Sequence, residues 1–225
     1  MPQDSPKLRA TGSLTVKRGT RAICRTSRLT VLFADLRGYT GLAERLAPAR
    51  ILPLLDEFFS LLAGITTIHG GTVFHMAGDG MMAGFGGDDP TAHDGAREAL
   101  AAGHAMLQRF GVLAARWRQE LSIEAGIGVG LHLGEVALGM LGPPGHKSTT
   151  LVGDTVNVAA RLCSRARAGE VLLSCTVAAA LDIDGGAREL YIGPIPVLHL
   201  PQFELRGRTA PLDIWCVPAL ERVAF

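Results

Sequence analysis

The alternation of strand-like and helix-like segments is the feature that most limits how this chain can fold. From residue 29 onward, short apolar runs typical of buried strands alternate with longer runs whose apolar residues recur at helical spacing. Strands are predicted at 29–33, 72–77, 81–85, 123–133 and 136–141, and helices at about 51–65 and 96–110. This order predicts an α+β fold: a ferredoxin-like βαββαβ core with additional C-terminal helices and strands. We expect an antiparallel sheet with helices on one face.

Proline, glycine and capping residues indicate where the helices begin and end. The first helix takes Pro48 into its first turn and stops before the glycines at 70–71. Pro53 predicts either a late start of this helix or a kink. Asp154 is expected to cap a third helix that reaches about Arg167.

Charge and cysteine content exclude several classes of protein. The 225 residues carry 22 Lys and Arg against 21 Asp and Glu, and this net charge of +1 argues against a strongly basic nucleic-acid binder. Four cysteines without a CxxC pair argue against a zinc module or a disulfide scaffold. No apolar run approaches the length of a membrane span, and the N-terminus lacks the apolar stretch of a secretory signal. We therefore expect a cytoplasmic protein with no nucleic-acid partner and no membrane span.

The uneven distribution of charge separates a lead-in segment from one domain. Residues 1–28 hold seven basic residues and one acid, and prolines and glycines interrupt them. We expect a basic N-terminal tail or a short strand here, and the alternative is an arm that touches a partner or an anionic surface. Residues 29–217 form the predicted domain, and 218–225 form a C-terminal tail.

Two aspartates stand at unusual places in this pattern. Asp35 closes the first apolar strand, and Asp79 lies at the glycine-rich tip of the hairpin between the second and third strands. In a βαββαβ core the first strand lies between its neighbours, so the strand end and the hairpin tip converge. Two converging carboxylates suit one or two divalent cations whose shell is completed by phosphate. Taken singly, Asp35 is expected to cap a helix and Asp79 to form a turn.

A polar pair on the third helix is a second candidate. Asn157 and Arg161 are four residues apart, so both point from one face of the helix. A carboxamide and a guanidinium placed together can orient a hydroxyl and neutralise charge on a phosphoryl group. An exposed helical pair without function is the alternative.

Three glycines at 126, 128 and 130 imitate the spacing of a dinucleotide-binding loop. They lie within a predicted strand, and no helix follows them. We therefore interpret them as strand residues and not as a phosphate-binding loop.

Four segments that contain or flank these residues resemble the motifs of class III nucleotidyl cyclases, the adenylate and guanylate cyclase catalytic domain. They are 31–44 (VLFADLRGYTGLAE), 77–86 (AGDGMMAGFG), 128–135 (GVGLHLGE) and 152–162 (VGDTVNVAARL). The segments occur in the order that the family shows, and the resemblance covers roughly residues 29–217.

The resemblance implies a role for each residue that matches a motif. Asp35 and Asp79 match the metal-binding aspartates, with the backbone carbonyl of Leu36 as a further ligand, for two Mg²⁺ or Mn²⁺ ions per site. Asn157 and Arg161 match the pair that stabilises the transition state. The triphosphate is expected to bind the backbone amides of a turn and one basic residue: Gly38, Tyr39, Thr40 and Arg208.

The reaction that the resemblance implies is intramolecular. The ribose 3′-hydroxyl of ATP attacks the α-phosphorus in line, and pyrophosphate leaves, giving 3′,5′-cyclic AMP for intracellular signalling. Family members complete each site across a head-to-tail dimer. This chain carries both halves, so the resemblance implies a homodimer with two equivalent shared sites.

Two positions that match the family's base-reading residues leave the nucleotide open. The first is often Lys in adenylate cyclases and Glu in guanylate cyclases, and here it is His75. An imidazole can donate to a ring nitrogen or to a carbonyl, or His75 contacts no base. The second position is Thr150, which favours ATP. A guanylate cyclase, a catalytically weak nucleotide-binding regulatory module, and an output domain with a separate sensor or regulator remain alternatives.

Overall fold

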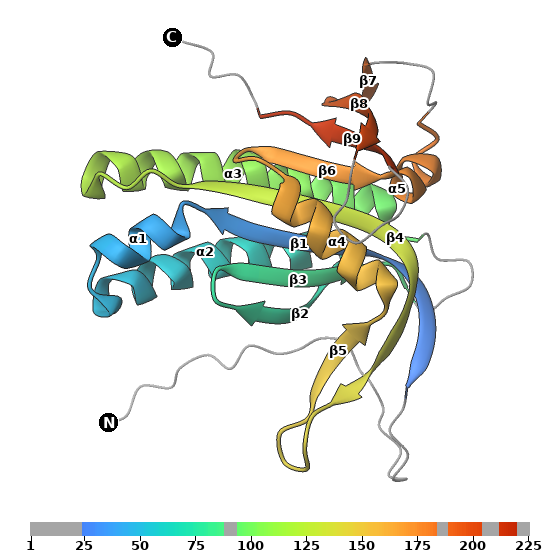
Figure 1. The fold of residues 1–225 in the computed structure, drawn as a ribbon, viewed down its shortest axis with the longest axis horizontal. Helices are drawn as coiled ribbons and strands as arrows, with labels where there is room; N and C mark the ends of the chain where they lie inside the picture. Colours follow the sequence, from blue (N-terminus) through green and yellow to red (C-terminus); the bar gives the residue numbers. More distant parts are fainter. Residues whose placement is uncertain (1–23, 88–93, 184–188, 204–211, 220–225) are drawn as a thin grey trace.

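The computed structural model of the protein describes residues 24–87, 94–183, 189–203 and 212–219. These residues form five helices and nine strands (Figure 1). The helices are α1 (Tyr39–Arg45), α2 (Pro48–Ile68), α3 (Ala96–Leu121), α4 (Asp154–Arg165) and α5 (Cys175–Ala180). The strands are β1 (Arg25–Arg37), β2 (Thr72–Ala77), β3 (Gly80–Phe85), β4 (Gly126–Leu141), β5 (Ser148–Val152), β6 (Glu170–Ser174), β7 (Glu189–Ile192), β8 (Ile195–Phe203) and β9 (Leu212–Val217). Strand β1 thus begins before residue 29, where the domain is predicted to start.

All nine strands belong to one sheet, in the order β2-β3-β1-β4-β6-β9-β8-β7, with β5 paired to β4. The four strands β2, β3, β1 and β4 are antiparallel neighbours, which confirms the ferredoxin-like βαββαβ core. Strands β4 and β6 run parallel, so the expectation of a wholly antiparallel sheet is wrong at this pair. The chain passes from β4 to β6 through β5 and α4, and a parallel pair requires a long crossover connection of this kind.

Helices cover both faces of the sheet. Helices α2 and α3 bury the face that carries Leu32 and Leu131. Helix α4 lies across the opposite face of β1 and β4, where its Ala159 packs with Val31 (Figure 1). The prediction that helices lie on one face is therefore wrong. Successive strand residues point to opposite faces, and both Val31 and Leu32 are fully buried, so each face needs a cover.

Several element boundaries differ from the prediction. Helix α2 begins at Pro48 and continues through Pro53, so the late start is wrong. Strand β4 is continuous where we predict two strands, because its glycines pair in register with β1 and do not interrupt it. Helix α4 has Gly153 at its N-cap, so Asp154 is its first residue and not its cap. The predicted hairpin and the end of the first long helix before the glycines at 70–71 are confirmed.

Helix α2 is apolar over much of its length. Its 21 residues are long and apolar enough to cross a membrane by length and composition alone, so the expectation that no apolar run approaches that length is wrong. In the structure its inward side packs in the core, where Phe58 and Leu62 are fully buried. The Phe58 ring meets Phe110 of α3 edge-on, with 5.5 Å between the centroids. A helix of a domain core passes the same test of length and composition.

The glycines of β4 allow α4 to approach the sheet at backbone distance. A Cβ at Gly130 would lie 2.2 Å from the backbone nitrogen of Cys163 and 2.5 Å from the carbonyl oxygen of Ala159. A Cβ at Gly134 would lie 2.6 Å from the hydroxyl oxygen of Thr155. These glycines of β4 therefore allow helix α4 to pack closely on the strand, which agrees with the interpretation of the glycines as strand residues.

Replacing Gly130 by Ala is expected to destabilise the domain by about 2–3 kcal/mol, because the new methyl group overlaps backbone atoms that cannot rotate away. Urea unfolding followed by circular dichroism measures the change. Gly111→Ala in α3 is the matched control, since a Cβ there meets nothing within 4 Å and alanine favours a helix. Equal stability of the two variants would contradict the close contact.

Candidate active site

The end of β1 and the tip of the β2–β3 hairpin lie next to each other. The backbone N–H of Leu36 donates a hydrogen bond of 3.0 Å to the carbonyl oxygen of Asp79. Asp35 pairs in register with Gly80, the first residue of β3. A Cβ at Gly80 would lie 3.6 Å from Oδ2 of Asp35, an ordinary van der Waals contact, so the Asp35 carboxylate lies directly beside the start of β3. The fold thus brings Asp35 and Asp79 together at one corner of the sheet, which we call the carboxylate corner.

The Asp35 carboxylate lies among opposing electrostatic influences. Burial raises the pKa of this carboxyl above its ordinary value, the positive charge of Arg37 lowers it, and the negative charge of Asp79 raises it. The side chain of Asp35 is 35% exposed, so a ligand can reach it from solvent. A cation bound between Asp35 and Asp79 would offset both the burial and the repulsion.

The oxygen atoms of this corner suit a hard divalent cation. Carboxylates and backbone carbonyls are the ligands that Mg²⁺ and Mn²⁺ prefer. Among the residues that the structure describes, no group of three or more His, Cys, Asp or Glu side chains is placed to hold an ion. The chemistry of the two carboxylates, Asp35 and Asp79, fits such a cation, whose other ligands would be backbone carbonyl, water or phosphate oxygens.

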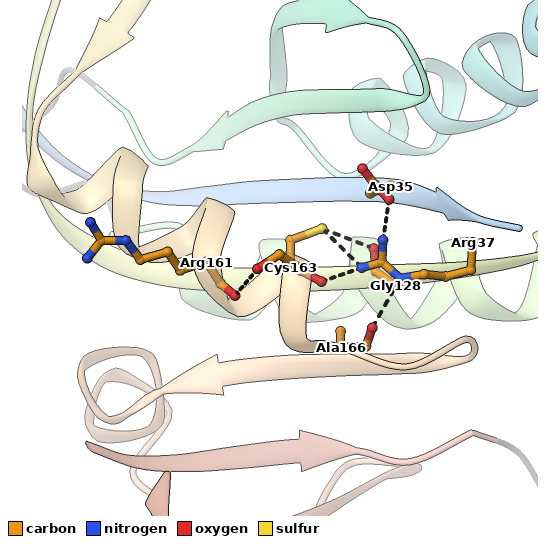
Figure 2. Close-up of polar contacts among 7 residues, drawn as sticks. Asp35, Arg37, Gly128, Arg161, Cys163 and Ala166 are labelled. Atoms are coloured by element: carbon orange, nitrogen blue, oxygen red, sulfur yellow. Dashed lines mark hydrogen bonds and ion pairs between the residues drawn. The ribbon is translucent and has the colours of Figure 1, made fainter. Parts of the chain in front are cut away.

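Arg37 belongs to this corner, although the sequence did not single it out. Its guanidinium forms an ion pair with Oδ1 of Asp35 and donates to the carbonyl oxygen of Cys163 (Figure 2). Its Nε donates to the carbonyl oxygen of Ala166 over 3.1 Å. One feature of the sequence could have pointed to Arg37. Asp35 and Arg37 are two residues apart on one strand, so their side chains share a face of the sheet.

The predicted triphosphate-binding turn begins three residues after Asp35. Gly38 has a φ of 90° and stands at the N-cap of α1, and its conformation is one that side-chain-bearing residues rarely adopt. A Cβ there would also lie 2.9 Å from the carbonyl oxygen of Glu124. The first N–H groups of a helix have no partner within it, so the amides of Tyr39 and Thr40 can donate to a ligand.

Both residues of the predicted transition-state pair stand on α4, and the Arg161 side chain is directed away from the Asp35 carboxylate (Figure 2). Asn157 is exposed and Arg161 half-buried. The chain therefore presents two separate groups of residues and does not by itself bring Arg161 to the Asp35–Asp79 corner.

The two predicted base-reading residues stand on strands β2 and β5, which contact each other but do not pair in the sheet. His75 is exposed on β2, in register with Met82 of β3. Thr150 is half-buried on β5, in register with Gly139 of β4. Strands β2 and β5 contact each other, so the two positions lie in the same part of the domain. Arg208, the predicted basic contact to the triphosphate, lies outside the described residues.

Curated proteins with similar sequences include adenylate cyclases. Adenylate cyclase of Anabaena cylindrica is 32% identical over 145 residues, which cover 61% of this chain and 27% of that protein. Adenylate cyclase 1 of Rhizobium meliloti is 30% identical over 147 residues, which cover 64% of this chain and 21% of that protein. The chain therefore matches about a quarter of the length of these relatives.

Solved structures of cyclases share the fold over nearly their whole length. The adenylyl cyclase CyaB from P. aeruginosa superposes with a TM-score of 0.77 at 28% identity, covering 88% of this chain and 97% of that one. The guanylyl cyclase Cya2 superposes with a TM-score of 0.71 at 28% identity, covering 91% and 98%. The family described as the adenylate and guanylate cyclase catalytic domain matches residues 22–207. The sheet order, the carboxylate corner and this match together show that the chain belongs to the adenylate and guanylate cyclase catalytic domain family.

Proposed function

We propose that the protein is an adenylate cyclase that converts ATP to 3′,5′-cyclic AMP and pyrophosphate. The convergence of Asp35 and Asp79 at an accessible corner, in a chain of this family, carries the proposal. Thr150 at the second base-reading position favours ATP. The similarity to adenylate cyclases of Anabaena cylindrica and Rhizobium meliloti supports the same nucleotide.

A guanylate cyclase is the second candidate. His75 stands where adenylate cyclases often carry Lys, and the guanylyl cyclase Cya2 is as similar in sequence as the adenylyl cyclase CyaB, at 28% each. A neutral imidazole can donate to or accept from either base, so His75 alone does not select one of them. A weakly catalytic nucleotide-binding module would be the outcome if neither nucleotide were converted.

In the proposed mechanism, the residues of the carboxylate corner bind and position the nucleotide. Asp35, Asp79 and the carbonyl of Leu36 would hold Mg²⁺ or Mn²⁺, which when bound supplies Lewis-acid chemistry to the 3′-hydroxyl and the phosphates. The amides of residues 38–40 and the side chain of Arg208 would hold the triphosphate. His75 and Thr150 would contact the base.

The residues of α4 would act at the reacting phosphorus. The 3′-oxygen forms a bond to the α-phosphorus and loses its proton, while the bond to the bridging oxygen breaks and pyrophosphate leaves. Asn157 would orient the ribose through its carboxamide. Arg161 would offset the negative charge that accumulates on the phosphoryl oxygens in the transition state.

We propose that the carboxylate corner of one chain meets Asn157 and Arg161 of a second chain across a head-to-tail homodimer. Within one chain, the Arg161 side chain points away from Asp35, so one chain alone leaves each group incomplete. A two-fold arrangement would place α4 of one chain against the carboxylate corner of the other, and it would do so twice. A monomer is then expected to be inactive.

Asp79→Asn is expected to lower cyclic AMP formation at least ~100-fold, since it removes a charged cation ligand and keeps the size of the side chain. Purified protein is incubated with ATP or GTP and Mg²⁺ or Mn²⁺, and the cyclic nucleotides are quantified. Asp56→Asn, on an exposed position of α2, is the matched control and should retain full activity. Unchanged turnover in Asp79→Asn would contradict the cation assignment.

Mixing two inactive variants tests the shared site. Co-expressed Asp79→Ala and Arg161→Ala chains should form heterodimers with one intact site, and random pairing predicts about a quarter of the wild-type activity. Asp79→Ala is preferable to Asp35→Ala because Asp35 also pairs with Arg37. Asp79→Ala mixed with Asp35→Ala is the control. It should stay inactive, because neither chain then carries an intact pair of cation-binding carboxylates. Absence of rescue in the first mixture would refute the shared site.

His75→Lys is expected to shift the ratio of kcat/KM for ATP over GTP by about tenfold toward ATP, since a charged donor replaces an ambiguous one. Met76→Lys adds the same charge on the opposite face of β2 and serves as the control. An equal ratio in wild type and His75→Lys would show that residue 75 makes no contact with the base.

A further inference from the structure

Arg37 connects two parts of the domain that lie far apart in the sequence. One end of its guanidinium pairs with the Asp35 carboxylate on β1. The other donors reach the carbonyl oxygens of Cys163 and Ala166, in the last turn and at the C-cap of α4. The side chain is 24% exposed, so most of it lies within the fold. One side chain thus bonds both to the carboxylate corner and to the helix that carries Arg161 (Figure 2).

Strand β4 provides the space through which Arg37 reaches the helix. A Cβ at Gly128 would lie 2.5 Å from Nη2 of Arg37, so a larger residue there would displace the guanidinium. The Cys163 thiol donates to the carbonyl oxygen of Gly128 over 3.3 Å. Burial raises the pKa of that thiol to about 12, so it keeps its proton and remains a donor.

The end of α4 is a favourable place for a guanidinium. The last carbonyls of a helix lack partners within it and carry partial negative charge. The planar fork of arginine can serve two carbonyl oxygens and a carboxylate at once, which an ammonium cannot do in the same geometry. Arg37 therefore bonds to the C-terminal end of α4 while its positive charge faces Asp35.

We infer that Arg37 is a positioning residue that ties the Asp35 carboxylate to the C-terminal turn of α4, and so fixes Asn157 and Arg161 relative to the carboxylate corner of the same chain. The roles of Asp35, Asn157 and Arg161 in turnover rest on the proposed function, whereas the bonds of Arg37 to Asp35 and to the end of α4 do not. In a dimer with shared sites, α4 of each chain would act in the site whose carboxylate corner belongs to the partner. Arg37 would then connect the cation-binding residues of one site to the transition-state residues of the other.

The Arg37–Asp35 ion pair has a consequence for cations. A divalent cation at Asp35 must share the carboxylate with the guanidinium and is repelled by its charge. Arg37 is therefore expected to lower the affinity for a cation bound without nucleotide. Removal of Arg37 should strengthen binding of the metal alone and loosen α4, two effects of opposite sign that a general loss of stability would not produce.

Arg37→Gln tests both effects in the full chain. Amide hydrogen exchange of residues 164–166, measured by mass spectrometry without metal, should accelerate about tenfold because two charged hydrogen bonds to the helix end are lost. Calorimetric titration with Mn²⁺ alone should show about tenfold tighter binding. The kcat for ATP should fall at least ~tenfold with little change in KM, since groups held by α4 act in the transition state.

Arg37→Lys separates charge from geometry. It keeps the positive charge, so Mn²⁺ affinity should remain near that of wild type, but it cannot reproduce the fork, so exchange in α4 should still accelerate. Arg109→Gln, at an exposed position of α3, makes the same chemical change away from the site and should alter neither readout.

The outcomes separate this inference from the proposed function. Unchanged exchange at 164–166 in Arg37→Gln would overturn the inference, and so would acceleration that extends equally through α3, since that would indicate general destabilisation. If wild type bound no Mn²⁺ while exchange in α4 accelerated as expected, the cation assignment of the proposed function would fail and the tie to α4 would stand.

Discussion

The contact of α4 with the glycine face of β4 is the constraint on which the site depends. At Gly130 the helix backbone comes so close that no Cβ fits, so backbone atoms and not adaptable side chains set the height of the helix above the sheet. Gly128 leaves the neighbouring space in which Arg37 reaches the same helix. Asn157 and Arg161 stand on α4, so their positions depend on glycines of the neighbouring strand β4.

The parts of the fold that the sequence predicts well depend on local signals. The hairpin around Asp79 follows from its flanking glycines, and helix α2 follows from its apolar spacing and from Pro48. The position of Asp35 beside Asp79 follows once the strand order is accepted, because that order leaves β1 next to β3. A pattern read along the chain is sufficient for each of these features.

The features that the sequence did not reveal depend on contacts between distant segments. The parallel pairing of β4 with β6 and the packing of α4 on the second face arise only when the crossover after β5 is placed in space. Arg37 lies within a recognised motif, yet its partners Cys163 and Ala166 are more than a hundred residues away, at 126 and 129 positions along the chain. No periodicity or local spacing encodes such a bond.

The charges around Asp35 explain how an arginine can stand beside a candidate cation ligand. Burial of the Asp35 carboxyl and the negative charge of Asp79 both raise the pKa of Asp35 above its ordinary value. Arg37 supplies a positive charge that opposes this effect in the folded chain. Cation binding at Asp35 would then be partly an exchange of one positive partner for another. It would gain less binding free energy than at two carboxylates without a positive neighbour. A triphosphate brings further negative charge and further oxygen ligands, so the corner is better suited to a cation and nucleotide bound together than to a cation alone.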